Sequence, residues 1–198
     1  MTEPSIKGMT LMAVVEDVKR LRDDGRISDG QLTAALEPLE LGWLEEKIQP
    51  ALWYPIGGYE RLTQLLLRSE GRGDPGYLVR RGETVARRLI ESGMYAQLRH
   101  GDQRREEARA GGRPVDEHDG RLMTTLASSI FNFGAWRFRQ EGDHAVIEGA
   151  DVEPMPDVSV LAARGLIAAI ASHVRDAPVE VTSERPERGR VLFRYPST

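Results

Sequence analysis

The sequence predicts an α+β fold, in which a helical amino-terminal half precedes a β-β-α-β-β carboxy-terminal half with a small antiparallel sheet. Apolar residues recur at helical spacing up to about residue 133. Alternation of apolar and polar residues then replaces that period. A strongly apolar helix over 158–174 separates the two strand pairs. At 198 residues we expect a single domain over 1–198, in which residues 1–133 are mainly helical and residues 134–198 contain the sheet.

Composition excludes several classes of protein. A hydrophobic content of 40% with 29% charged residues is typical of a globular chain. The net charge of −4 provides no basic field, so we expect no nucleic-acid partner. No apolar run reaches membrane-spanning length, so we expect no membrane span. With no cysteine and no signal-peptide pattern, the chain is predicted to be cytoplasmic and to lack thiolate metal sites.

Apolar stripes predict the helices of the first half. Ser28 or Asp29 can cap the second of them, and Asp74-Pro75 opens the last. The stripes cover 11–21, 32–36, 43–48, 59–69 and 78–90.

The segment 51–62, ALWYPIGGYERL, concentrates three aromatic residues in a chain that is only 6% aromatic. It could be a ligand site or a corner between two helices, and we favour the corner. Pro55 would end one helix and Tyr59 would begin the next, while Trp53 and Tyr54 fill the wedge between them.

The segment 101–120 is almost wholly polar and rich in glycine, so it is predicted to be an exposed, mobile loop. Its arginines alternate with acids, which indicates a solvated segment rather than a nucleic-acid arm. Glu117-His118-Asp119 is not expected to bind metal, because adjacent residues rarely converge on one ion. We therefore predict no metal site and no cofactor.

The elements after residue 120 are predicted from the change from helical spacing to strand-like alternation. A helix over 122–133 leads into a hairpin of 135–139 and 144–148. Helix 158–174 is apolar over much of its circumference, so it should be buried on more than one side, under a sheet or in a dimer. Strands 179–182 and 191–195 close the chain around the turn 185–189.

Four arginines cluster on the predicted helix 78–90. They could bind an acidic partner or form a solvated face with local ion pairs. They are Arg80, Arg81, Arg87 and Arg88.

Several short segments resemble those of a large paralogous family of uncharacterised myxobacterial proteins. They are Ile6-Lys7-Gly8, Trp53-Tyr54-Pro55, the run from Phe133 to Phe138, and Arg164-Gly165-Leu166. The element order after residue 120 is also similar to the heme nitric-oxide/oxygen-binding (H-NOX) fold and to the vinyl-4-reductase-like ligand-binding fold. The resemblance implies a ligand-binding sensor fold and a homodimer through helix 158–174.

The chain departs from the heme sensors of that fold. Those sensors use a mid-chain histidine as iron ligand and a Tyr-x-Ser-x-Arg tripod for the propionates. His100 stands at the corresponding place, but no such tripod exists in this sequence. The vinyl-4-reductase-like relatives often carry carboxy-terminal cysteines, and this chain has none. We therefore do not expect heme.

These observations predict a non-enzymatic regulatory or sensory module that binds a protein partner or a small molecule. No nucleophile–base pairing indicates an enzyme. A pocket should lie between the amino-terminal helices and the carboxy-terminal sheet, with Arg137 available to hold an acidic group. The alternative is a structural or scaffold subunit of a larger assembly. The aromatic residues expected to line the pocket are Trp53, Tyr54, Tyr59, Phe131, Phe133 and Trp136.

Overall fold

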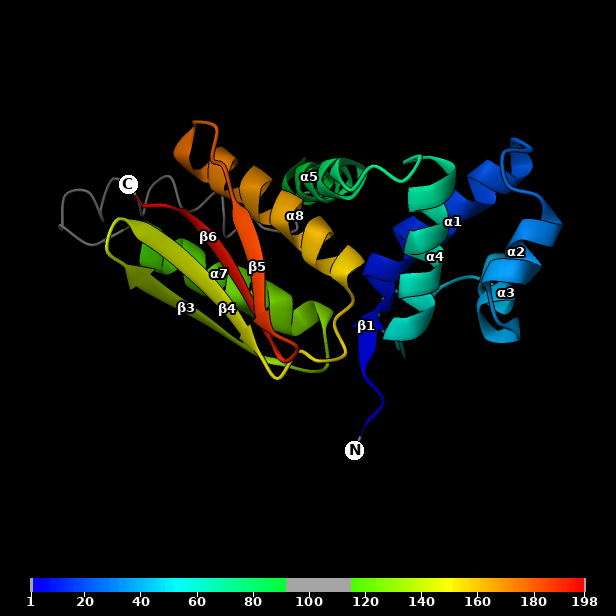
Figure 1. The fold of residues 1–198 in the computed structure, drawn as a ribbon, viewed down its shortest axis with the longest axis horizontal. Helices are drawn as coiled ribbons and strands as arrows, with labels where there is room; N and C mark the ends of the chain where they lie inside the picture. The colour runs from blue at the N-terminus through cyan, green and yellow to red at the C-terminus, as the bar shows by residue number, and fades with distance from the viewer. Residues whose placement is uncertain (1, 92–114, 198) are drawn as a thin grey trace.

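The computed structural model describes residues 2–91 and 115–197 (Figure 1). Helices α1 to α4 form one end of the molecule, and a four-stranded sheet with α7 and α8 forms the other, while α5 lies alongside α8. The elements are β1 (Ser5–Lys7), α1 (Gly8–Asp23), α2 (Asp29–Ala35), α3 (Pro38–Glu45), β2 (Trp53–Pro55), α4 (Ile56–Ser69), α5 (Gly76–Glu91), α7 (Val115–Ile130), β3 (Ala135–Glu141), β4 (His144–Ala150), α8 (Asp157–Arg175), β5 (Thr182–Glu187) and β6 (Arg190–Pro196).

The predicted helices of the first half are present, except that the one predicted at 43–48 runs instead from Pro38 to Glu45. Caps explain where two of the helices begin. The Ser28 hydroxyl accepts a hydrogen bond from the Gln31 N–H at the start of α2. Asp74 Oδ1 accepts one from the Gly76 N–H at 2.9 Å, just before α5. The apolar stripe of α1 is buried against α4 in one core cluster.

The aromatic segment 51–62 contains a strand that the sequence analysis did not predict. Trp53 to Pro55 form β2, which pairs antiparallel with β1 and places Ile6 opposite Tyr54. Tyr54 is half-buried and meets the Trp43 ring edge-on at a centroid separation of 5.5 Å. Trp53 is 42% exposed, with the Lys7 ammonium 4.1 Å from its ring centre. The prediction that Trp53 fills a wedge between helices is therefore wrong, because the strand turns it outward.

The predicted β-β-α-β-β order is present after residue 133, and the sheet is antiparallel with the strand order β3-β4-β6-β5. Several boundaries differ from the prediction, among them the end of β5, which runs to Glu187 inside the predicted turn 185–189. Helix α7 begins at Val115, inside the predicted loop 101–120, whose residues 101–114 lie outside the described residues. Strand β5 begins at Thr182 rather than at 179, since Val179 and Val181 pack into the core before the ladder starts.

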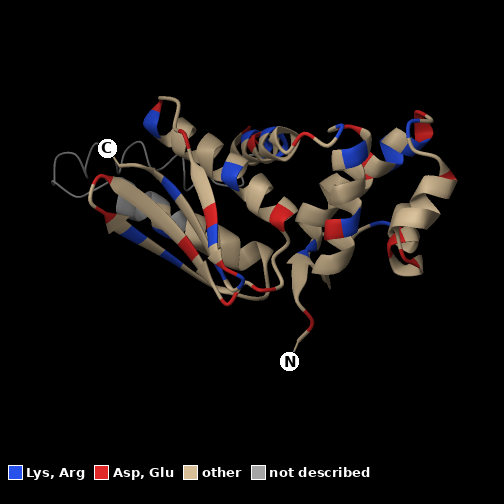
Figure 2. Cartoon of the chain, in the orientation of Figure 1, with Lys and Arg blue, Asp and Glu red and all other residues tan. Residues whose placement is uncertain are grey.

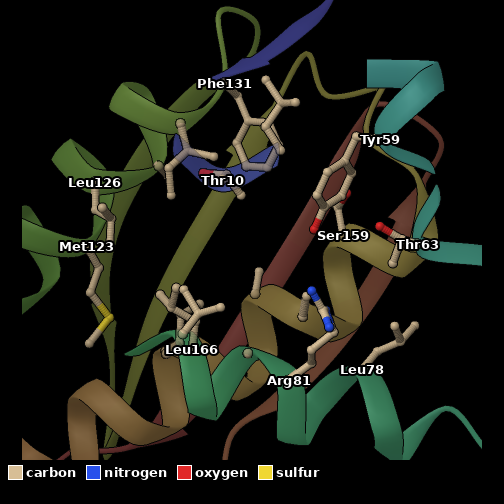
Figure 3. A pocket seen from close by; sticks show the side chains of 18 of the residues that line it. Thr10, Tyr59, Thr63, Leu78, Arg81, Met123, Leu126, Phe131, Ser159 and Leu166 are labelled. Carbon is tan, nitrogen blue, oxygen red and sulfur yellow. The ribbon is translucent and has the colours of Figure 1, made fainter. Parts of the chain in front are cut away.

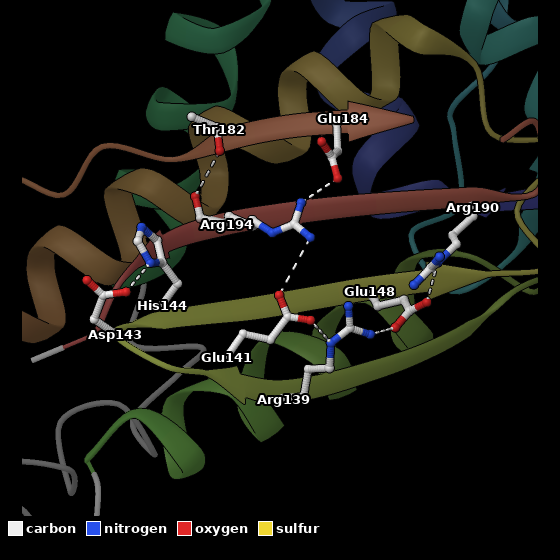
Figure 4. Close-up of polar contacts among 9 residues, drawn as sticks. All are labelled: Arg139, Glu141, Asp143, His144, Glu148, Thr182, Glu184, Arg190 and Arg194. Carbon is white, nitrogen blue, oxygen red and sulfur yellow. Dashed lines mark hydrogen bonds and ion pairs between the residues drawn. The ribbon is translucent and has the colours of Figure 1, made fainter. Parts of the chain in front are cut away.

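The two faces of the sheet differ in character. Phe138, Ile147 and Phe193 lie opposite one another in register on the inner face, which packs into the second core cluster. The outer face carries a ladder of ion pairs across the strands (Figure 4). Glu148 accepts hydrogen bonds from Arg139 and from Arg190, the latter at 2.5 Å. Val146 is fully buried on this outer face, opposite Arg139 and Arg194 in register, so the arginine stems cover it.

Helix α8 is buried on two sides within the chain. Its apolar residues pack against the sheet, and its backbone lies against α5. A Cβ atom at Gly165 would lie 1.9 Å from the Val79 carbonyl oxygen, and one at Gly82 would lie 1.9 Å from the Ala162 carbonyl oxygen. Among the described residues, α8 has the length and hydropathy of a membrane span, and in this fold its apolar residues pack against the sheet. A dimer is not needed to explain its composition.

Candidate functional site

An interior cavity of about 100 Å³ lies where the two halves of the chain meet. Side chains from α1, α4, α5, α7 and α8 line it, together with β1 and the inner face of the sheet. This is the place at which the sequence analysis expected a pocket.

Three of the aromatic residues predicted for the pocket line this cavity: Tyr59, Phe131 and Trp136. Tyr59 projects from α4 and is 6% exposed. Trp136 at the start of β3 stacks on Phe131, with ring centres 6.1 Å apart and planes 24° from parallel. Large aromatic side chains therefore set the shape of the cavity between α4 and the sheet.

The other predicted residues lie elsewhere. Trp53 and Tyr54 are on β2, away from the cavity lining. Phe133 is half-buried between the two core clusters and touches the cavity only through Phe131, at a ring separation of 5.4 Å. Arg137 is exposed opposite Glu148 on the outer face of the sheet. Because neighbouring residues of a strand face opposite sides, Arg137 cannot join Trp136 in the cavity.

Polar side chains gather at one end of the cavity (Figure 3). They are Tyr59 and Thr63 of α4, Ser159 of α8 and Arg81 of α5. The hydroxyls of Thr63 and Ser159 are buried without a hydrogen-bond partner, and these residues are 1% and 3% exposed. Nothing in the sequence singles out Thr63 or Ser159, because a single helical hydroxyl carries no signal of what faces it.

Arg81 closes this polar end. Its guanidinium forms an ion pair with Asp17 of α1 and donates to the Ala13 carbonyl oxygen at 3.3 Å and to the Tyr77 hydroxyl at 3.5 Å. Burial acts to lower the pKa of Arg81, but the Asp17 carboxylate outweighs it and raises that pKa. The guanidinium is therefore charged and already neutralised by its partner.

Burial likewise controls the Tyr59 phenol. Removal from water raises its pKa, and the positive charge of Arg81 opposes that rise without cancelling it. Thr63 Oγ1 also lies near enough to oppose the rise, although it makes no hydrogen bond of ordinary geometry. The phenol is therefore neutral, and it retains its O–H as a donor.

A surface cleft of about 300 Å³ lies on the other side of Arg81, between α1 and α5. Arg80, Arg81 and Arg88 line it together with Asp17 and Glu70, while Arg87 is exposed beside it and donates to Thr84 Oγ1 at 3.3 Å. The predicted arginine face is thus divided, since Arg81 turns inward and the other three point outward. Figure 2 shows acidic and basic residues interspersed along these helices rather than separated into fields of one sign.

The described lining of the cavity supplies no histidine for a heme iron, and the cavity is small for a cofactor. Cofactor pockets have volumes of roughly 300–1,000 Å³, several times that of this cavity, and Trp136 and Phe131 fill the space beside it. No histidine is among the described residues that line it. His100 lies outside the described residues, as does the side chain of His118, while His144 pairs with Asp143 at 2.6 Å on the surface. Among the residues whose side chains the structure describes (2–91, 120–121 and 123–197), no cluster of metal-binding side chains occurs.

Comparisons with known proteins place the fold. No protein-family model matches the chain, and no curated protein matches its sequence. An unliganded Fe(II) H-NOX protein from K. algicida superimposes with a TM-score of 0.58 at 12% identity, covering 98% of this chain and 97% of that one. A mutant of T. tengcongensis H-NOX gives a TM-score of 0.55 at 14% identity, covering 98% of each chain.

A further H-NOX structure, from work on heme distortion, gives a TM-score of 0.59 at 15% identity and covers 98% of this chain and 95% of its own. The similarity extends over nearly the whole chain and is not confined to the elements after residue 120. The comparisons do not reveal the myxobacterial family, so that resemblance stays a prediction. The chain has the fold of the H-NOX proteins.

Proposed function

We propose that this chain is a non-enzymatic, cytoplasmic sensory or regulatory module that holds a small molecule other than heme in its interior cavity. The cavity between the helical half and the sheet is the observation that carries the proposal. It is lined mainly by apolar side chains with a few polar groups at one end, which is the usual composition of a small-molecule site.

The fold supports the same proposal. One structural neighbour is described as an Fe(II) protein and another through its heme, so this architecture holds a prosthetic group in those proteins. Here the space is smaller and lined differently, which favours a smaller ligand. Binding that changes how the helical half sits on the sheet would then be transmitted to a protein partner or to a second copy of the chain through α8.

Native mass spectrometry of the protein purified from its own host tests the proposal. We expect each chain to carry excess mass of small-molecule size. Ala163→Leu, which adds three carbons to the cavity lining, should remove that mass. Ala34→Leu, on the exposed side of α2, is the matched control and should retain it. A bare wild-type mass would count against the proposal.

A second candidate, a scaffold subunit of a larger assembly, is favoured by one surface feature. Met9, Leu52 and Trp53 are 38%, 56% and 42% exposed, and backbone hydrogen bonds hold their segments together, among them Gly8 N–H to the Leu52 carbonyl at 2.9 Å. Exposed apolar patches mark interaction surfaces. If Leu52→Glu releases a co-purifying protein and no small molecule is found on the chain, the scaffold function is the better description.

A further inference from the structure

We propose that the polar end of the interior cavity binds the oxygen of a compact, neutral amphiphile, namely a hydroxyl or carbonyl group on an apolar ring or branched chain. Thr63 and Ser159 are the positioning hydroxyls, and the Tyr59 phenol is the third. This proposal rests on the proposed function, because it names the ligand class of the same cavity.

The hydroxyls of Thr63 and Ser159 lack the hydrogen bond that helical hydroxyls ordinarily make. Serine and threonine inside helices ordinarily donate to a carbonyl one turn earlier. Other residues of this chain do so: Thr84 donates to the Arg80 carbonyl at 3.0 Å, and Ser172 to the Ala168 carbonyl at 2.7 Å. Thr63 and Ser159 are buried and make no such bond. A buried polar group without a partner is unfavourable, so these two hydroxyls are available to a ligand.

The positions of the hydroxyls also favour a single ligand group. Figure 3 shows the hydroxyls of Tyr59 and Thr63 on the side of the cavity where Ser159 and Arg81 lie. The three hydroxyls come from α4 and α8, two helices that contact each other and both line the cavity. Each hydroxyl can donate and accept, so together they suit a ligand hydroxyl or carbonyl equally well.

The charges at the polar end of the cavity favour a ligand whose oxygen-bearing group is neutral. Arg81 is the charged side chain among the described cavity-lining residues, and Asp17 already neutralises it. A ligand carboxylate would have to displace Asp17, whereas a neutral oxygen needs only the unpaired hydroxyls. Burying an uncompensated charge costs much more than burying a hydrogen-bonded hydroxyl.

The other end of the cavity determines the size and polarity of the rest of the ligand. Met123, Leu126, Phe131 and Leu166 make it largely apolar (Figure 3), although Thr10 and Trp136 also line the cavity and Trp136 Nε1 is buried without a hydrogen-bond partner. An apolar cavity of about 150 Å³ holds a benzene molecule. The cavity here, of about 100 Å³, has about two-thirds of that volume, so it suits a short branched chain, or one six-membered ring if flexible lining side chains such as Met123 shift slightly.

Paired titrations with phenol and benzene, followed by NMR on the whole chain, test the proposal. The two probes have nearly the same shape and differ by one hydroxyl. We expect phenol to bind wild type at least as tightly as benzene. If the phenol hydroxyl found no hydrogen-bond partner in the cavity, phenol would bind more weakly than benzene. In Thr63→Val with Ser159→Ala, phenol affinity should fall about tenfold and benzene affinity should hold.

Thr125→Val is the matched control, since Thr125 is exposed on α7 and donates to the Arg121 carbonyl at 2.8 Å. It should change neither affinity. Both probes could bind wild type while the double variant lowers neither affinity, or lowers both affinities equally. That result would keep the cavity as a binding site but refute the hydroxyl subsite, and buried water would then be the ordinary partner of these hydroxyls. If neither probe binds wild type, the proposed function fails as well. If the double variant of Thr63→Val with Ser159→Ala does not fold, Ser159→Ala alone allows the same comparison, with a smaller expected loss of phenol affinity.

Discussion

Arg81 on α5 and Asp17 on α1 form an ion pair that stands between the interior cavity and the surface cleft. Arg81 lines both hollows, as do Ala13 and Val85 beside it. The side chains of Arg81 and Asp17 are only 15% and 27% exposed, so the pair is well shielded from water. Arg81 therefore forms part of the wall between the two hollows, and its pairing with Asp17 holds it in that position.

Asp17→Asn tests the strength of that closure. Removing the carboxylate leaves the Arg81 guanidinium half-buried without its counter-charge, which should lower the free energy of unfolding by about 2 kcal/mol. Hydrogen exchange of amides that border the cavity should become faster. Urea denaturation and exchange monitored by NMR measure the two effects.

The control is Glu45→Gln, which breaks a solvent-exposed pair with Arg22. Exposed pairs contribute little, so its stability should remain within about 0.5 kcal/mol of wild type. Equal losses in the two variants would show that the Arg81–Asp17 pair has no special role.

Gly165→Ala tests the close contact of α5 with α8. The new Cβ would meet the backbone carbonyl of Val79, and backbone cannot move aside as a flexible side chain can. The helices must separate, so we expect a loss of about 2–4 kcal/mol in a thermal or urea unfolding measurement. Because the cavity lies beside this contact, binding of an apolar probe should weaken too.

Gly42→Ala provides the comparison, because Gly42 also lies inside a helix but has open space where a Cβ would be placed. Alanine favours the helix by up to about 1 kcal/mol there, so this variant should be more stable than wild type. A stabilised Gly165→Ala protein would contradict the packing described for α5 and α8.

The pH dependence of stability should report the hydrogen bond from Tyr77 to Glu70. Burial acts to raise the pKa of Glu70, but the Tyr77 hydroxyl at 2.7 Å and the Arg20 guanidinium at 3.2 Å outweigh it and lower that pKa below 4.5. Between the lowered value and 4.5 the unfolded chain binds more protons. The contribution of Glu70 is therefore complete above about pH 5 and is lost as the pH falls through the folded value.

The same hydrogen bond acts at alkaline pH. Burial and the Glu70 carboxylate raise the pKa of Tyr77 from 10.0 to about 12. The stabilisation from the neutral phenol is therefore complete below about pH 10 and is lost as the pH rises towards 12. Urea unfolding at a series of pH values should show that Glu70→Gln flattens the acid limb and Tyr77→Phe the alkaline limb. Unchanged limbs in both variants would show that this hydrogen bond does not control the pH dependence.

The sequence by itself determined the types of the elements and much of their order. Helical spacing in residues 11–21 and period-two alternation after residue 134 each reflect which side of an element faces a core, and this depends only on local geometry. Three of the aromatic residues named from the sequence, Tyr59, Phe131 and Trp136, line the cavity. Period two could also have separated Arg137 from Trp136, because adjacent strand residues face opposite ways.

Only the tertiary structure decided the rest. The strands β1 and β2 have three residues each, too few to show a period, and they exist because segments about 48 residues apart meet as Ile6 and Tyr54. Arg81 faces inward because Asp17, 64 residues earlier, lies across from it, whereas the adjacent Arg80 finds only the exposed Asp74. The unpaired hydroxyls of Thr63 and Ser159 depend on what α4 and α8 place opposite them. Local pattern specifies which face of an element is buried, but the partner that meets a polar group is specified only when distant segments pack.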